Sequence, residues 1–282
     1  MALCNRVTIV GLGLIGGSLG MAIRRRRLAR EVVGVSRQSS RLVQARRRGA
    51  IDRGSTLAEE AVRDATVVIL ATPVDAIVPS ARRIARFMRP GSLLTDVGST
   101  KASIVLSLER TLPPGIAFVG AHPLTGSEQQ GIAAARADLF DESVCIVTAT
   151  RWTNRRALRF LTRLWKPLVH RVVVMDPQAH DRLLAQVSHL PHLVAFCLVG
   201  ATNHGALALA PQSFLDATRV AKSDPDLWDD ILLSNRAALL RAIDRFDRRW
   251  HGLRTHLVHR DRAALRRFLS RAQSLRHALH ER

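Results

Sequence analysis

The chain has 282 residues, of which 47% are apolar, and this combination suits two globular domains and excludes a disordered protein. Its formal net charge of +20 invites a nucleic-acid-binding interpretation. Against it, all but three of the 43 basic residues are arginines spread along the whole chain, and aromatic residues, which stack on bases, make up only 4%. We therefore interpret the charge as solvated surface that also attracts anionic substrates, and expect no nucleic-acid partner.

Three cysteines, Cys4, Cys145 and Cys197, are far apart and form no Cys-x-x-Cys pair. This usage is typical of a reducing cytoplasm, and of neither a disulfide framework nor a zinc site. The apolar run that follows Arg6 could be mistaken for a signal peptide, but its glycine spacing indicates a folded turn instead. No apolar stretch reaches 18 residues, so the sequence predicts a cytoplasmic protein without a membrane span.

A short β-branched segment, residues 6–10, is followed at once by Gly11, Gly13 and Gly16, in the spacing G-x-G-x-x-G that opens a helix. The first glycine permits a tight turn, and the second lets the backbone approach a pyrophosphate. The third lets the helix pack close to the strand, and the helix N-terminus then faces the anion. On its own the pattern also fits a tight strand–helix turn without a ligand.

Four further strands are expected at residues 31–37, 65–73, 91–99 and 115–123, and a last one near 144–149. They alternate with helix-like stretches, which is the pattern of a doubly wound parallel sheet. Together with the glycines, this predicts an α/β dinucleotide-binding domain of the Rossmann type.

The second expected strand ends about 20 residues after the glycines, where such a domain places the residue that contacts the ribose. An acidic residue there is typical of NAD, but this segment contains Ser36, Arg37 and Arg41 and no acid. A hydroxyl and two guanidinium groups suit a 2′-phosphate. The alternative is that both are ordinary surface arginines. We predict NADP as the preferred cofactor, with NAD as the alternative.

Residues 151–174 hold one amphipathic helix and a short apolar run. The pattern changes at Asp176, a helix N-cap before Pro177 at the first helical position, and a long apolar helix follows. A second cap, Asp224 before a proline, starts a helix that is predicted to run to about Trp250. The remaining residues are predicted to form a basic helical hairpin.

No strand signal follows residue 175, which predicts a Rossmann domain over residues 1–174 and an all-helical domain over residues 175–282. The predicted helices carry much apolar surface and have no large domain to cover it. We therefore expect a homodimer that forms through the helical domain.

Two candidate catalytic residues follow expected strands. Ser99 lies in the segment DVGSTK, at the carboxyl edge where doubly wound sheets bind ligands. His122 ends the next strand, before a proline, and a histidine there can accept a proton from a substrate hydroxyl near neutral pH. The alternative for His122 is a structural histidine bonded to a loop carbonyl.

His189 and His192 lie three residues apart on one face of the apolar helix, around a proline, and a pair of this kind lines a cavity more often than a core. No third or fourth ligand is spaced to join them, so no metal site is expected. Arg219, Ser223 and Trp228 surround a predicted helix break. Arg219 suits a substrate carboxylate, and the alternative is a surface ion pair with a nearby aspartate.

Taken together, these segments resemble the prephenate and arogenate dehydrogenases. The matching segments, in order from about residue 5 to 240, are GLGLIGGS, ATPV, DVGSTK, GAHPLTGSEQQG, HD at 180–181, SHLPHLVAF and TRVAKSDPDLW. The resemblance implies a Rossmann domain, a helical dimerisation domain and an active site between them. It further implies the oxidative decarboxylation of prephenate to 4-hydroxyphenylpyruvate in tyrosine biosynthesis, with hydride transfer to NAD(P)+.

The resemblance also assigns roles. His122 would be the catalytic histidine that hydrogen-bonds the ring hydroxyl, Ser99 would position it and the nicotinamide, and Arg219 would hold a carboxylate. The residues implied to line the substrate pocket or its entrance are His192, Ser223, Trp228 and Glu128, and we add His189 because it pairs with His192. The residues expected to contact the cofactor are Gly11, Gly13, Leu14, Ile15, Gly16, Ser36, Arg37, Arg41, Thr72, Pro73 and Ser99. Among these, the segment of Ser36, Arg37 and Arg41 departs from the family, since it lacks the acid common in members that use NAD.

Three other interpretations remain at this point. An arogenate or dual-specificity cyclohexadienyl dehydrogenase would look almost the same, although His189 and His192 favour prephenate. A β-hydroxyacid dehydrogenase would need a lysine early in the helical domain, and none lies between Lys166 and Lys222. A non-catalytic NADPH-binding sensor would not need to keep the reactive residues.

Overall fold

The computed structural model describes residues 2–125 and 129–279. The chain forms two compact units, residues 1–235 and residues 236–282. The strands are β1 (Cys4–Val10), β2 (Ala29–Val35), β3 (Arg53–Ser55), β4 (Val67–Leu70), β5 (Leu93–Asp96), β6 (Ala117–Pro123), β7 (Val144–Thr148) and β8 (Arg171–Met175). Helices of the first unit that pack around the sheet are α1 (Leu14–Arg25), α2 (Ser39–Arg47), α3 (Ala58–Ala61), α4 (Val74–Ala85), α5 (Ala102–Thr111) and α6 (Arg155–Trp165), with a 3-10 turn, η1 (Ile132–Ala134).

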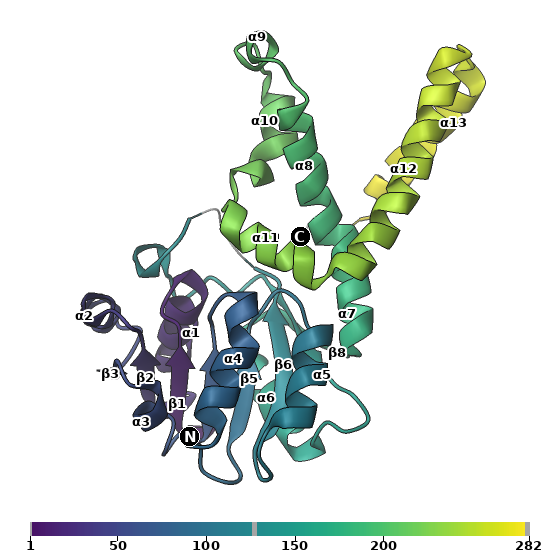
Figure 1. Cartoon of the computed structure of the whole chain (residues 1–282). Helices are drawn as coiled ribbons and strands as arrows, with labels where there is room; N and C mark the ends of the chain where they lie inside the picture. Colours follow the sequence, from purple (N-terminus) through teal and green to yellow (C-terminus); the bar gives the residue numbers. More distant parts are fainter. Residues whose placement is uncertain (1, 126–128, 280–282) are drawn as a thin grey trace. The chain divides into compact units, whose positions relative to one another are not determined.

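The strands form one sheet in the order β3-β2-β1-β4-β5-β6-β7-β8 (Figure 1). Every pairing from β3 to β6 is parallel, and the order reverses direction at β1, as in a doubly wound fold. The predicted α/β Rossmann-type class is therefore confirmed.

At one edge the sheet differs from the prediction of parallel strands throughout. Strand β7 pairs antiparallel with β6, and β8 runs parallel to β7. Neither β3 nor β8 was predicted as a strand. The first has only three residues, Arg-Gly-Ser, and the second is a five-residue edge strand, so both are too short to show a clear period.

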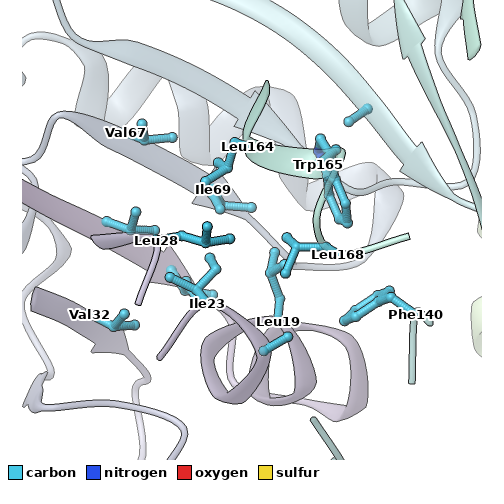
Figure 2. Close-up of a cluster of buried hydrophobic side chains, with 14 of the residues drawn as sticks. Leu19, Ile23, Leu28, Val32, Val67, Ile69, Phe140, Leu164, Trp165 and Leu168 are labelled. Carbon is cyan, nitrogen blue, oxygen red and sulfur yellow. The ribbon is translucent and has the colours of Figure 1, made fainter. Parts of the chain in front are cut away.

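Side chains of the central strands alternate between the two faces of the sheet, so each face has its own core. On β4, Val67 and Ile69 join one cluster, and Val68 and Leu70 join the other. The first cluster includes side chains of α1, α2 and α6, and Figure 2 shows part of it over β4. The second includes side chains of α3, α4 and α5.

The rest of the first unit is helical. Its segments are α7 (Pro177–Leu184), a π-helical segment η2 (Ala185–His189), α8 (Leu190–Gly200), α9 (His204–Leu207), α10 (Gln212–Thr218), a 3-10 turn η3 (Arg219–Lys222) and α11 (Pro225–Ser234). Both predicted caps are confirmed: Asp176 accepts two backbone N–H groups at the start of α7, and Asp224 accepts one at the start of α11. Trp228 and Ile231 of α11 complete the second core cluster.

The run from Pro177 to Gly200 is long and apolar enough, by length and composition alone, to cross a membrane. One such helix is weak evidence of a membrane span, although only 22% of this window is buried within the described chain. The sequence predicts the run as a long apolar helix but not as a membrane span, because polar residues such as Gln186 and Ser188 interrupt it. Near its start, the side chains of His180 and Asp181 are buried among protein groups.

The predicted helix from Asp224 to about Trp250 is wrong, because α11 ends at Ser234 and a new helix begins at Arg236. The second unit is the predicted basic hairpin, made of α12 (Arg236–Val258) and α13 (Arg262–His277). Its large apolar side chains include many exposed ones, among them Phe246, Trp250, Leu257, Val258, Leu269 and Leu275.

Helix α1 packs closely on the backbone at Gly20, where a Cβ atom would overlap the carbonyl oxygen of Ala50. We expect Gly20→Ala to lower the free energy of unfolding by about 1–3 kcal/mol, as overpacking does, in a urea titration. Gly17→Ala is the matched control, since its Cβ would mainly meet the flexible end of Ile132. The control should lose less, and equal losses would contradict this explanation.

Candidate active site

The carboxyl ends of β1, β4, β5 and β6 lie side by side at one edge of the sheet, because these strands are parallel neighbours. The glycine turn follows β1, Thr72 follows β4, Ser99 follows β5 and His122 lies near the end of β6. The topology therefore brings the sequence-predicted cofactor and catalytic segments to one place.

The glycine turn fits a dinucleotide. Gly11 has a φ of +99°, and a Cβ atom on it or on Gly16 would overlap a backbone carbonyl oxygen. At Gly13, a Cβ would meet nothing within 4 Å, so space is open beside the start of α1, where Leu14 and Ile15 form the first turn. Helix α1 has no side-chain cap, which leaves its first N–H groups available to an anion.

The hydroxyl oxygen of Thr72 is buried and has no hydrogen-bond partner among the described residues, as expected for a group that serves a ligand. Pro73, which follows it, is exposed at the start of α4.

The predicted ribose segment follows β2. Ser36 is buried, and its Oγ accepts a hydrogen bond from the backbone N–H of Gln38 at 3.2 Å. Arg37 and Arg41 are exposed, and Arg41 lies in the first turn of α2. Within the described part of the chain, neither guanidinium group forms an ion pair with a carboxylate. Their predicted role toward a 2′-phosphate stays a prediction.

A chain of hydrogen bonds runs inward from His122. Its Nδ1 lies 2.9 Å from Nε2 of His180, and Nδ1 of His180 lies 2.8 Å from Oδ1 of Asp181. Burial, and then the charge of His180, lower the pKa of His122 well below its ordinary value. Burial also lowers the pKa of His180. Both imidazoles are therefore neutral near pH 7, and a neutral His122 can accept a proton.

Asp181 is held at the start of α5. Its Oδ1 accepts the backbone N–H of Lys101 at 2.8 Å, and its Oδ2 accepts that of Ala102 at 2.9 Å. The amide Nδ2 of Asn235 donates to the backbone carbonyl of Asp181 at 2.8 Å. These contacts fix the carboxylate that orients His180.

A fully buried ion pair, Lys101 with Asp96, lies beside these histidines. Burial raises the pKa of the Asp96 carboxyl, while the Lys101 ammonium and the Gly98 N–H oppose that rise. The Lys101 charge also contributes to the lowered pKa of His122, after burial and His180.

Three of the predicted substrate-pocket residues, His189, His192 and Trp228, contact one another. Trp228 stacks on His192, with ring centroids 3.7 Å apart, and meets His189 edge-on at 6.0 Å. Burial, and then the Arg219 charge, lower the pKa of His192. Arg219 is therefore near enough to the stacked pair of His192 and Trp228 to act on it electrostatically. His189 is buried, and its Nδ1 lies 3.1 Å from Asn235 Nδ2.

Other predicted residues are less closely tied to this cluster. Ser99 is half-buried between β5 and α5, and no hydrogen bond joins it to His122 in the described part of the chain. Ser223 is half-buried just before α11. Glu128 lies outside the described residues. The loop beyond it contacts α11, since Gln130 Nε2 donates to Asp224 Oδ2 at 2.8 Å.

Five side chains of the site were not assigned a role from the sequence: His180, Asp181, Asn235, Lys101 and Asp96. The motif HD at 180–181 was visible as a resemblance only. An adjacent histidine and aspartate inside an apolar helix could have signalled a buried polar network, because such groups are costly unless they are bonded.

Comparisons with known proteins identify the family of this chain. The family models described as "Prephenate dehydrogenase, nucleotide-binding domain" and "Prephenate dehydrogenase, dimerization domain" match residues 19–174 and 176–271. A prephenate dehydrogenase of Bacillus subtilis is 34% identical, covering 98% of this chain and 76% of that protein. A cyclohexadienyl dehydrogenase of Zymomonas mobilis is also 34% identical, covering 99% and 97%. The crystal structure of A. aeolicus prephenate dehydrogenase with hydroxyphenyl propionate and NAD+ matches with a TM-score of 0.91 and 31% identity, covering 98% of each chain.

A dinucleotide-binding sheet with a neutral histidine at its carboxyl edge defines an oxidoreductase that uses a nicotinamide dinucleotide. The chain belongs to the prephenate dehydrogenase family.

The buried histidines predict a loss of stability in mild acid. Burial lowers the pKa of His189 from 6.5 to about 4, so below pH 6.5 the unfolded chain takes up a proton that the folded one refuses. Each such histidine costs about 1.4 kcal/mol per pH unit in this window. Between pH 7 and pH 5, urea titrations of His189→Gln should show about 2 kcal/mol less destabilisation than the wild type. Equal losses would mean that folded His189 titrates normally.

Proposed function

We propose that this chain oxidatively decarboxylates prephenate to 4-hydroxyphenylpyruvate, in the route to tyrosine, with a nicotinamide dinucleotide as the hydride acceptor. The observation that carries the proposal is His122, a neutral histidine at the same edge of the sheet as the glycine turn. Its Nδ1 is engaged with His180, so Nε2 is the nitrogen that remains for a substrate hydroxyl. Membership of the family supports the choice of substrate.

The residues that would hold the dinucleotide are Gly11, Gly13 and the first turn of α1, with Thr72 beside them. When it is bound, the nicotinamide accepts a hydride from the ring carbon that bears the hydroxyl group. We assign Ser99 to this junction between nicotinamide and His122, on its place in the loop after β5.

His122 would act twice in each turnover. It takes the hydroxyl proton as the ring carbonyl develops. It holds that proton while the bond from the ring to its carboxylate breaks, carbon dioxide leaves and the electron pair makes the ring aromatic. It then returns the proton to the phenolate oxygen, so no net proton is taken up or released.

The substrate would lie against the cluster of His192 and Trp228, with Arg219 holding a carboxylate through its guanidinium group. Ser223 and Glu128 belong to the same proposed pocket. His189 and His192 are neutral near pH 7, since burial lowers both pKa values. Nδ1 of His189 accepts from Asn235 Nδ2, so neutral His189 carries its proton on Nε2, which can donate a hydrogen bond to the side-chain keto group of prephenate. His192 gives its one N–H to the backbone carbonyl of Ser188.

Arogenate, which has an amino group in place of that keto group, is the alternative substrate. The relative from Zymomonas mobilis that bears the name cyclohexadienyl dehydrogenase supports a dual-specificity enzyme. Steady-state assays of the purified chain with both substrates and both cofactors decide among a prephenate, an arogenate and a dual-specificity dehydrogenase. If neither substrate is turned over, the remaining interpretation is a non-catalytic NADPH-binding sensor.

We also propose a cytoplasmic homodimer. The described structure has three free cysteines, which suits a reducing compartment. The exposed apolar side chains of α12 and α13, and the match to a dimerisation-domain model over residues 176–271, support assembly through the helical part. We keep the domain boundary near residue 175.

The proposed base can be tested directly. We expect His122→Asn to lower kcat by about 10²–10⁴-fold, because proton transfer in the transition state is lost. The dissociation constant of the cofactor, measured by fluorescence titration, should stay near the wild-type value. A kcat close to that of the wild type would overturn the mechanism.

The cofactor preference rests on the exposed Arg37 and Arg41 after β2. We expect a higher kcat/KM with NADP than with NAD for the wild type. Removal of both guanidinium groups in Arg37→Ala/Arg41→Ala should cost NADP about 1.5–3 kcal/mol, or roughly one to two decades in kcat/KM. NAD has no 2′-phosphate, so its kcat/KM serves as the internal control and should hardly change. A wild type that prefers NAD, or a double variant that uses NADP as well as before, would make these arginines ordinary surface charge.

A further inference from the structure

We propose that His180 and Asp181 are positioning residues for His122: they set which of its nitrogens is free of a proton, and His180 takes over the Nδ1 proton of His122 while His122 holds the substrate's proton during decarboxylation. The proposal rests on the proposed function for its substrate, and on geometry alone for the proton positions. Both act through His122, His180 by a direct contact and Asp181 through His180.

The proton positions follow from the hydrogen bonds. A carboxylate can only accept, so Nδ1 of His180, 2.8 Å from Oδ1 of Asp181, carries a proton. A neutral imidazole has one N–H, so Nε2 of His180 is an acceptor. Nδ1 of His122 lies 2.9 Å from it and must donate. By the same rule Nε2 of His122 is unprotonated, which is the state that a general base requires.

Asp181, the inner end of this chain of hydrogen bonds, is held in place by the backbone. Asp181 cannot turn away from His180 without giving up the backbone N–H groups of Lys101 and Ala102. These groups begin α5, whose N-terminal end also favours a negative charge. The carboxylate therefore stays an acceptor, and the order of donors and acceptors cannot reverse.

Charge then favours the inner histidine as the holder of an extra proton. The groups that act on His122 are His180, Lys101 and His189, of which none is negative, and its backbone faces the neutral thiol of Cys145. His180 also faces Lys101, but two carboxylates act on it, those of Asp181 and Asp96.

A proton can therefore pass through the pair. When Nε2 of His122 takes the hydroxyl proton, the Nδ1 proton of His122 shifts to Nε2 of His180, which becomes an imidazolium beside Asp181. Once carbon dioxide has left, the same two shifts in reverse deliver a proton to the phenolate oxygen. Every bond formed in the first half is broken in the second, and no other co-reactant is needed.

Two variants separate the two roles. In Asp181→Asn the amide can donate to Nδ1 of His180, which reverses the donors and leaves Nε2 of His122 protonated. We expect a loss in kcat of about 10³–10⁴-fold, as for a wrong tautomer. In His180→Gln the side-chain oxygen still accepts from His122 but cannot hold a proton, and we expect a smaller loss, on the order of 10-fold. KM for prephenate and cofactor affinity should stay within about twofold in both variants, because ground-state binding is untouched.

The matched control is His170→Gln, at an exposed histidine before β8, which should keep wild-type kcat. Circular dichroism and cofactor titration of each variant identify any that fails to fold. Wild-type kcat in both Asp181→Asn and His180→Gln would overturn the proposal.

The tautomers are measured on the 15N-labelled full chain by long-range 1H–15N spectra of the imidazole rings. The His122 signals, identified by their loss in His122→Asn, should show Nδ1–H and a bare Nε2 in the wild type. This measurement needs no variant at Asp181 and no substrate. A bare Nδ1 in an enzyme that turns over prephenate overturns the inference and leaves the function standing. A bare Nε2 in a protein that turns over neither prephenate nor arogenate overturns the function and leaves the tautomer assignment standing.

Discussion

The carboxylate of Asp181 is the contact on which the rest of the site depends. Through the N–H groups of Lys101 and Ala102 it joins the first helix after the sheet to the helix that follows β5. One of these oxygens, Oδ1, also orients His180, and His180 engages His122. Asp181 therefore serves two purposes. It joins α7 to the start of α5, and it orients the histidines of the proposed proton transfer, so a change in one affects the other.

The electrostatics of the site differ from those of the surface. Most of the arginines are exposed and screened by salt, and their individual ion pairs contribute little to stability. Lys101 and Asp96 are fully buried, where removing two charges from water is costly and their mutual attraction is strong. Burial is the main cause of the lowered pKa values of His122 and His180; the Lys101 charge adds to the lowering at both, and the Asp96 charge opposes it at His180.

The sequence could predict those features that depend on residues close to one another along the chain. The glycine turn, the caps at Asp176 and Asp224 and the alternation of strands and helices are local, and the structure has all of them. The break at Asn235 and the role of Asp181 are not local. Asp181 bonds to residues 79 and 80 positions earlier, and Asn235 contacts it from 54 positions later. No periodicity encodes such contacts, so they became visible only in the folded chain.

The π-helical segment Ala185–His189 decides which side of its helix the later residues occupy. Each helical residue advances by about 100°, so His180 and His192, twelve residues apart, would point about 120° apart on an unbroken α-helix. A single π-turn absorbs one extra residue, and the angle falls to about 20°. One added residue thus brings two imidazoles onto the same side of the helix. The number of residues in this helix, and not only their chemistry, is a requirement of the site, and a chain one residue shorter here would keep every functional group but separate them.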